Sequence, residues 1–143
     1  MISAAPAAIA LSGALSQTDR VSAAAANLAN QQSVGALPGG SGSTTGAAGR
    51  APVPAYQPVT AGTVSTGAAG GVATVYRPIT PAYLPEYQPD AAAANANGLV
   101  AAPNVDAAQN LLTLKTANAA YQTNLAVIKT TDQMNRDVLR LTA

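Results

Sequence analysis

The distribution of proline and glycine constrains this chain more than any other feature of its sequence. Ten of the 12 glycines lie within residues 35–71, and eight of the 10 prolines lie within residues 38–89. Both residue types disfavour the interior of a helix. Two long terminal segments, residues 3–32 and 104–142, can therefore form helices, whereas the middle of the chain cannot.

Residues 3–32 have the spacing of a helix that packs against a partner helix. Their single proline is at position 6, where the first turn of a helix tolerates it. Residues at alternating intervals of three and four, all apolar except one, are Ala4, Ala7, Leu11, Ala14, Thr18, Val21, Ala25 and Leu28. This is the a/d pattern of a coiled-coil seam. We expect the helix to end before the glycine and proline signals that begin at Gly35.

Residues 104–142 predict a second, longer helix. Asn104 is a favourable N-cap, and Asp106 in the first turn would complement the helix dipole. The helix would span roughly 55 Å at 1.5 Å per residue. Its first apolar stripe contains Ala107, Leu111, Leu114, Asn118, Tyr121, Leu125, Ile128 and Leu139, and its second contains Ala117, Ala120, Val127, Met134, Val138 and Leu141. Together the stripes are wider than one partner helix needs.

The middle of the chain, residues 33–103, predicts extended structure with a flexible connection. Residues 39–49 are almost entirely Gly, Ser, Thr and Ala, which is typical of a flexible linker. Short runs at 53–59 and 72–79 favour β-strands. The prolines that follow exclude a regular helix and a central strand, so we expect only a small, irregular β insert.

These segments define the expected fold class and its divisions. We predict a mainly α protein whose long N- and C-terminal helices pack as a coiled-coil-like pair, with a small irregular β or extended insert between them. The N-terminal helical region is residues 1–32, the linker and insert are residues 33–103, and the C-terminal helical region is residues 104–143.

The composition predicts a weakly stable monomer. Hydrophobic residues make up 48% of the chain, but most are alanine, and Phe and Trp are both absent. Each large side chain that alanine replaces loses about 1.5–3 kcal/mol of burial. Neighbouring subunits are the simplest source of the missing burial, so we expect an assembling protein.

The residue types exclude most catalytic and binding chemistry. The chain has neither Cys nor His, so thiolate nucleophiles, imidazole bases and their metal sites are impossible. A net charge of +1 without a basic cluster argues against nucleic acid as a partner. The remaining alternative is an enzyme that uses two carboxylates, but the six acidic residues are scattered along the chain. We therefore expect no enzyme activity, no cofactor, no metal and no small-molecule substrate.

The N-terminus lacks the charge pattern of a secretory signal. No Lys or Arg precedes Arg20, so the positive n-region is missing. No run of about 18 strongly apolar residues suggests a membrane-spanning helix. A secreted, low-complexity surface protein remains the alternative to an assembling subunit, and it would show a cleaved N-terminus.

Three segments resemble the flagellar axial rod and hook proteins. Residues 25–30, AANLAN, resemble the signature near the N-terminus of that family. Residues 97–106, NGLVAAPNVD, are similar to its entry into the C-terminal helix, and residues 120–128, AYQTNLAVI, resemble the tyrosine-centred part of that helix. The last two segments together favour the proximal-rod subtype over hook or filament proteins.

The resemblance implies a structural subunit of the bacterial flagellar basal-body rod. It implies export by the flagellar type III apparatus, assembly in the periplasm with itself and other rod proteins, and transmission of torque between motor and hook. The site residues that we expect are subunit-interface residues rather than catalytic ones. They are Leu11, Leu15, Val21, Asn27, Leu28, Asn30, Asn104, Leu111, Leu114, Tyr121, Leu125 and Ile128.

Overall fold

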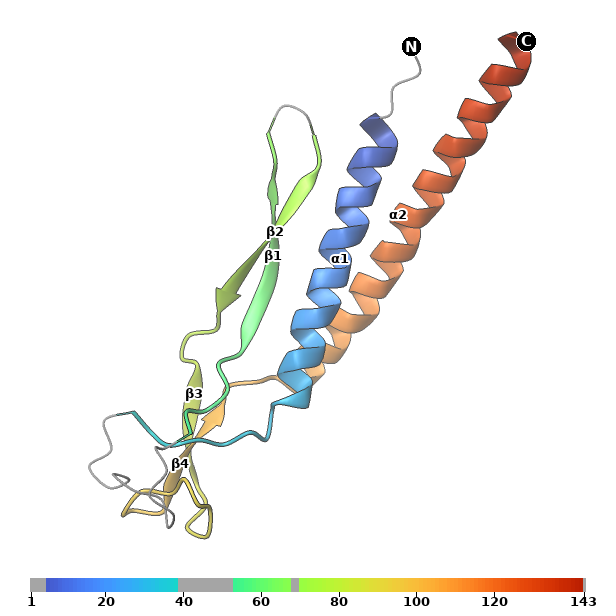
Figure 1. Ribbon diagram of the computed structural model, residues 1–143. Helices are drawn as coiled ribbons and strands as arrows, with labels where there is room; N and C mark the ends of the chain where they lie inside the picture. The colour runs from blue at the N-terminus through green and yellow to red at the C-terminus, as the bar shows by residue number, and fades with distance from the viewer. Residues whose placement is uncertain (1–4, 39–52, 68–69, 143) are drawn as a thin grey trace. The chain divides into compact units, whose positions relative to one another are not determined.

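A computed structural model describes residues 5–38, 53–67 and 70–142. Its elements, in chain order, are α1 (Ala5–Ala29), β1 (Val59–Ser65), β2 (Val72–Pro78), β3 (Tyr83–Tyr87), β4 (Leu99–Pro103) and α2 (Ala107–Thr142) (Figure 1). Two helices with a small β insert between them in the chain confirm the expected architecture. The predicted flexible linker, residues 39–49, lies outside the described residues. None of the described helices is long and apolar enough to cross a membrane.

The chain divides into two compact units, and both helices contribute to each of them. Unit 1 comprises Met1–Ala24, Ala61–Arg77 and Leu111–Ala143, so it holds most of α1, of the β1–β2 hairpin and of α2. Unit 2 comprises Ala25–Thr60 and Pro78–Asn110, and it contains the two-stranded sheet of β3 and β4.

In unit 1 the β1–β2 hairpin lies along one side of α1 (Figure 1). The amide of Val72 donates a hydrogen bond to Ser12 Oγ at 3.1 Å, and that hydroxyl donates to the carbonyl of Ile9 at 2.8 Å. A Cβ atom at Gly71 would lie 2.9 Å from Ser12 Oγ, so only glycine allows this close approach. Further along, desolvation and the charge and hydrogen bond of Asp19 raise the pKa of the Tyr76 hydroxyl.

In unit 2 strands β3 and β4 pair antiparallel, with Tyr83 opposite Pro103 and Tyr87 opposite Leu99. On its other edge β4 is bridged by Gly35, which exchanges two backbone hydrogen bonds with Ala101 at 2.9 and 2.8 Å. Strand β3 is an edge strand of this sheet, which is where a sheet tolerates proline. The connection between the strands ends at Gly98, whose φ of 71° is one that side chains disfavour. Strand β4 carries the core of this unit, because Val100 and Ala101 are fully buried.

The first predicted strand was wrong, whereas the second was confirmed. Residues 53–58 form only an isolated bridge, between Pro54 and Ala36, and β1 begins at Val59 and continues to Ser65. Two prolines in the predicted run have no amide hydrogen for a strand ladder. The carbonyl of one of them, Pro58, accepts a hydrogen bond from the amide of Ile79 at 2.9 Å. Strand β2 ends one residue before the predicted 72–79 run.

The helix termini differ from the predicted ones by a few residues. Helix α2 begins at Ala107, and Asp106 is its N-cap, since Asp106 Oδ1 accepts a hydrogen bond from the Gln109 amide at 2.9 Å. The prediction of Asn104 as the cap was wrong, because its side chain instead donates to the carbonyl of Pro81 at 2.9 Å. Helix α1 ends at Ala29, where the Asn30 side-chain amide bonds the Ala26 carbonyl.

Candidate assembly surface

Helices α1 and α2 pack side by side and antiparallel within unit 1. Gly13 of α1 lies against Asn124 of α2, and a Cβ atom at Gly13 would be 2.9 Å from Asn124 Oδ1. Later in α1, Val21 lies near Tyr121 and Asn118, which come earlier in α2. The residue numbers therefore rise along one helix as they fall along the other. Small side chains on α1 allow this close approach of the two backbones.

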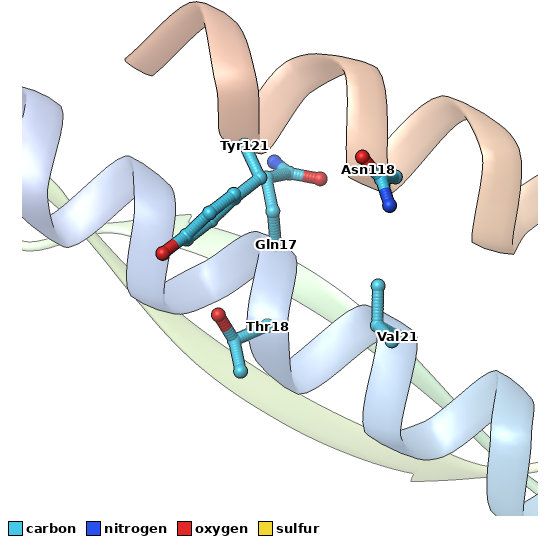
Figure 2. Close-up of a pocket in the computed structure, with 5 residues that line it drawn as sticks. All are labelled: Gln17, Thr18, Val21, Asn118 and Tyr121. Carbon is cyan, nitrogen blue, oxygen red and sulfur yellow. The ribbon is translucent and has the colours of Figure 1, made fainter. Parts of the chain in front are cut away.

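A shallow groove of about 190 Å³ runs between these two helices. Its lining residues are Gln17, Thr18, Val21, Asn118 and Tyr121. Figure 2 shows the side chains of Gln17 and Val21 rising from α1 toward α2, while Tyr121 and Asn118 extend from α2 toward α1. The groove is mostly apolar at its base and open to solvent, so it adds to the surface that another protein could cover.

Helix α1 covers the boundary between the two apolar stripes of α2 rather than either whole stripe. Ala117 is fully buried, and Asn124 and Ile128, which follow on the same side of α2, are half-buried. Residues further out on both stripes remain exposed. On the first stripe these are Leu111, Tyr121, Leu125 and Leu139, and on the second they are Val127, Met134, Val138 and Leu141.

Exposed leucines on α1 extend this apolar surface. Leu11 is 52% exposed and Leu15 is 59% exposed. Thr18, one turn after Leu15 on the same face of α1, lines the groove with Tyr121. Leu125 lies one turn beyond Tyr121 on α2 and is 43% exposed. We call Leu11, Leu15, Tyr121 and Leu125 the leucine surface; all four side chains are exposed.

The twelve expected interface residues occupy different environments. Five are exposed: Leu11, Leu15, Leu111, Tyr121 and Leu125. Six are half-buried: Val21, Leu28, Asn30, Asn104, Leu114 and Ile128. Asn27 alone of the twelve is buried, and its side chain bonds Asn110, Tyr56 and Val59 within unit 2. The structure gives Asn27 an internal role, while the participation of these residues in a subunit interface stays a prediction.

Sequence reasoning missed the face of α1 that meets the hairpin. Ser12, Ser16 and Asp19 recur at intervals of four and three, like the apolar seam, but they are polar. Ser12 and Asp19 contact β2, and Ser16 between them is buried. The spacing could have indicated a second packed face. The polar character of these residues gave no sign of packing, because polar residues on a helix usually face water.

The ionisable groups offer no catalytic arrangement among the described residues. In the described ranges no three acidic side chains approach closely enough to hold a metal ion. Two ion pairs, Asp132 with Arg136 at 2.9 Å and Asp137 with Arg140 at 3.9 Å, lie exposed along α2. Burial raises the pKa of the Tyr56 hydroxyl, which therefore stays protonated and remains a donor near neutral pH.

Comparisons with known proteins identify relatives along almost the whole chain. A family model described as flagellar basal body rod FlgEFG protein C-terminal matches residues 96–141. The chain is 35% identical over 136 residues to the flagellar basal-body rod protein FlgC of Salmonella typhimurium, covering 93% of this chain and 92% of that protein. The proteins of the same name from Salmonella typhi and Escherichia coli O6:H1 show the same identity and coverage.

Proposed function

Because the chain belongs to the family of the flagellar basal-body rod protein FlgC, we propose that it is a structural subunit of the bacterial flagellar basal-body rod. The observation that carries this proposal is the 35% identity over 93% of the chain and 92% of the relatives. The family match at residues 96–141 covers β4 and nearly all of α2. The protein is located in the basal-body rod and acts there as a building block, not as an enzyme.

The exposed apolar residues support a role in assembly with other rod proteins and with further copies of this chain. Burial of apolar surface stabilises association by about 25 cal/mol per Å² removed from water. The leucine surface and the outer residues of the second stripe would gain this stabilisation in the rod. In the assembled state the helices form coiled-coil-like contacts, and these contacts transmit torque between motor and hook.

The divisions of the chain have separate roles in this proposal. Residues 1–32 and 104–143 supply the rod helices, and residues 33–103 supply the insert between them. The interface residues are the twelve named above, of which Leu15, Leu111 and Leu11 have the most exposed aliphatic side chains. Delivery to the rod by the flagellar type III export apparatus is part of the same proposal.

Deletion of the gene tests this function directly. The deletion strain should not swim, and electron microscopy of its basal bodies should show no completed rod. Expression of the intact chain from a plasmid should restore both. A deletion strain that builds complete rods and swims at the wild-type rate, without a second gene of this kind, would contradict the proposal.

A further inference from the structure

The side chain of Asn27 joins three segments of unit 2. It is 2% exposed and lies in the last turn of α1. Its Nδ2 group donates to the Val59 carbonyl at 2.8 Å and to Asn110 Oδ1 at 3.1 Å. Its Oδ1 atom accepts from the Tyr56 hydroxyl and from the Val59 amide, both at 3.1 Å. We call Asn27, Tyr56, Val59 and Asn110 the Asn27 node.

All four hydrogen-bonding positions of the Asn27 amide are occupied. A primary amide has two donor hydrogens and one oxygen with two lone pairs. The Asn110 amide cannot exchange the positions of its oxygen and nitrogen without losing a hydrogen bond, because its Nδ2 group donates to the Asp106 carbonyl at 2.8 Å. Position 27 therefore needs a side chain with two N–H donors and one oxygen that accepts two hydrogen bonds. Aspartate lacks the donors, and leucine lacks both.

The residues before Asn27 cannot select one arrangement by shape. Residues 23–26 are four consecutive alanines, and Ala23 and Ala24 are buried. Alanine side chains are small and identical, so a rotated or shifted helix end would bury similar apolar surface. Asn27 is different, because an arrangement without its partners would leave a buried amide unsatisfied, which costs about 1–3 kcal/mol.

We propose that Asn27 is a positioning residue that selects the single arrangement of the end of α1, residues 56–59 and the first turn of α2. A buried asparagine can fix the register of packed helices in this way, by penalising the alternatives. The inference concerns the fold of one chain, and it holds whether or not that chain assembles into a rod.

Asn27→Leu and Asn30→Leu form a matched pair that tests this role. The two asparagines are three residues apart, but the hydrogen bonds of the Asn30 side chain are local: its amide donates to the Ala26 carbonyl at 2.9 Å, and its Oδ1 atom accepts from Ser33 Oγ at 3.4 Å. Two-dimensional amide spectra of the full chain would report Tyr56, Val59 and Asn110 separately. We expect Asn27→Leu to keep its far-UV helical signal while these resonances split or broaden, and Val59 amide exchange to become about tenfold faster. Asn30→Leu should match the wild type at all three residues.

Asn27→Asp separates hydrogen bonding from packing, because aspartate has nearly the same shape as asparagine. At neutral pH it would present only acceptors to the Val59 carbonyl and Asn110 Oδ1. We expect the same split or broadened resonances as for Asn27→Leu, whereas Asn30→Asp should show none. A single set of wild-type resonances with slow Val59 exchange in both Asn27 variants would overturn the proposal. Complete loss of helical signal in both would also overturn it, because the node would then be required for folding instead of selecting between folded arrangements.

Discussion

Replacement by alanine should change the free energy of unfolding differently at three serines of α1, raising it at two of them and lowering it at the third. Ser16 is 2% exposed, and its hydroxyl has no hydrogen-bond partner among the described residues. Ser12 lies one turn earlier on the same face, and its hydroxyl accepts from the Val72 amide at 3.1 Å. Ser22 is exposed and its hydroxyl donates to the Thr18 carbonyl within α1. The three positions therefore separate helix propensity from the burial of a polar group.

The magnitudes follow from two contributions to the free energy of unfolding. Replacement of serine by alanine in a helix stabilises by about 0.5 kcal/mol, which is the whole effect expected at Ser22. At Ser16 the change also removes a buried unsatisfied hydroxyl, so the total gain should be about 1.5 kcal/mol. At Ser12 it leaves the half-buried Val72 amide without its acceptor, and the net result should be a loss of about 1 kcal/mol.

Urea unfolding followed by far-UV circular dichroism would measure these differences. A fixed concentration of trimethylamine N-oxide strengthens burial and keeps a folded baseline for this weakly stable chain. The expected order of stability is Ser16→Ala, then Ser22→Ala, then the wild type, then Ser12→Ala. If Ser16→Ala were no more stable than Ser22→Ala, the Ser16 hydroxyl would not be an unsatisfied group. If Ser12→Ala were as stable as Ser22→Ala, the contact between the hairpin and α1 would contribute nothing.

Three further predictions concern the leucine surface and unit 2. Leu125→Asp should leave the monomer's circular dichroism almost unchanged but abolish swimming, because an ionised carboxylate in a desolvated contact costs several kcal/mol. Cells with the control substitution Ala126→Asp, at the neighbouring exposed position, should still swim. Equal motility of the two strains would show that Leu125 is not in the interface. Asp106→Ala should lower the free energy of unfolding by about 1 kcal/mol through loss of the α2 cap, measured by urea unfolding, and an unchanged midpoint would show that Asp106 does not cap the helix. Gly98→Ala should cost at least about 1–2 kcal/mol in the same assay, because φ is positive and the new Cβ would lie 2.8 Å from the Tyr87 ring. Gly62→Ala, where the nearest atom is 3.9 Å away, is its control and should cost much less.

The helices could be predicted from the sequence because proline and glycine mark where a helix cannot continue. The start of α2 could not be predicted to the residue. Asn104 and Asp106 are both good N-caps, and they stand two positions apart. The choice between them depends on the Pro81 carbonyl, which accepts a hydrogen bond from the Asn104 side-chain amide. Pro81 is 23 residues away from Asn104 in the sequence.

The β insert was harder to predict because prolines and glycines interrupt its runs of strand-forming residues. Residues 53–59 look like a strand by composition, yet two prolines remove the amide hydrogens that a ladder needs. Strand β1 instead continues through Gly62, a residue that usually weakens a strand. Here the partner strand and the contact with α1 decide the outcome, and neither is local in the sequence.

The candidate surface was predicted in its residues but not in its layout. The two stripes of α2 indicated more apolar surface than one helix could cover, and Leu125 and Met134 are indeed exposed. Only the structure shows that α1 covers the boundary between the stripes, with Ala117 at its centre. The internal role of Asn27 was also hidden, because its partners Tyr56 and Asn110 lie 29 and 83 residues away.

The presence of this protein in isolated basal bodies tests the central claim most directly. The chain has no cysteine, so one cysteine introduced at an exposed position of α2 would give it a single site for a gold label, and basal bodies that contain the chain without this cysteine would be the control. We predict that basal bodies purified from swimming cells contain the protein by mass spectrometry, with the gold label on the rod. Complete basal bodies that lack the protein, with the protein found only in the culture medium or elsewhere in the cell, would contradict its role as a rod subunit.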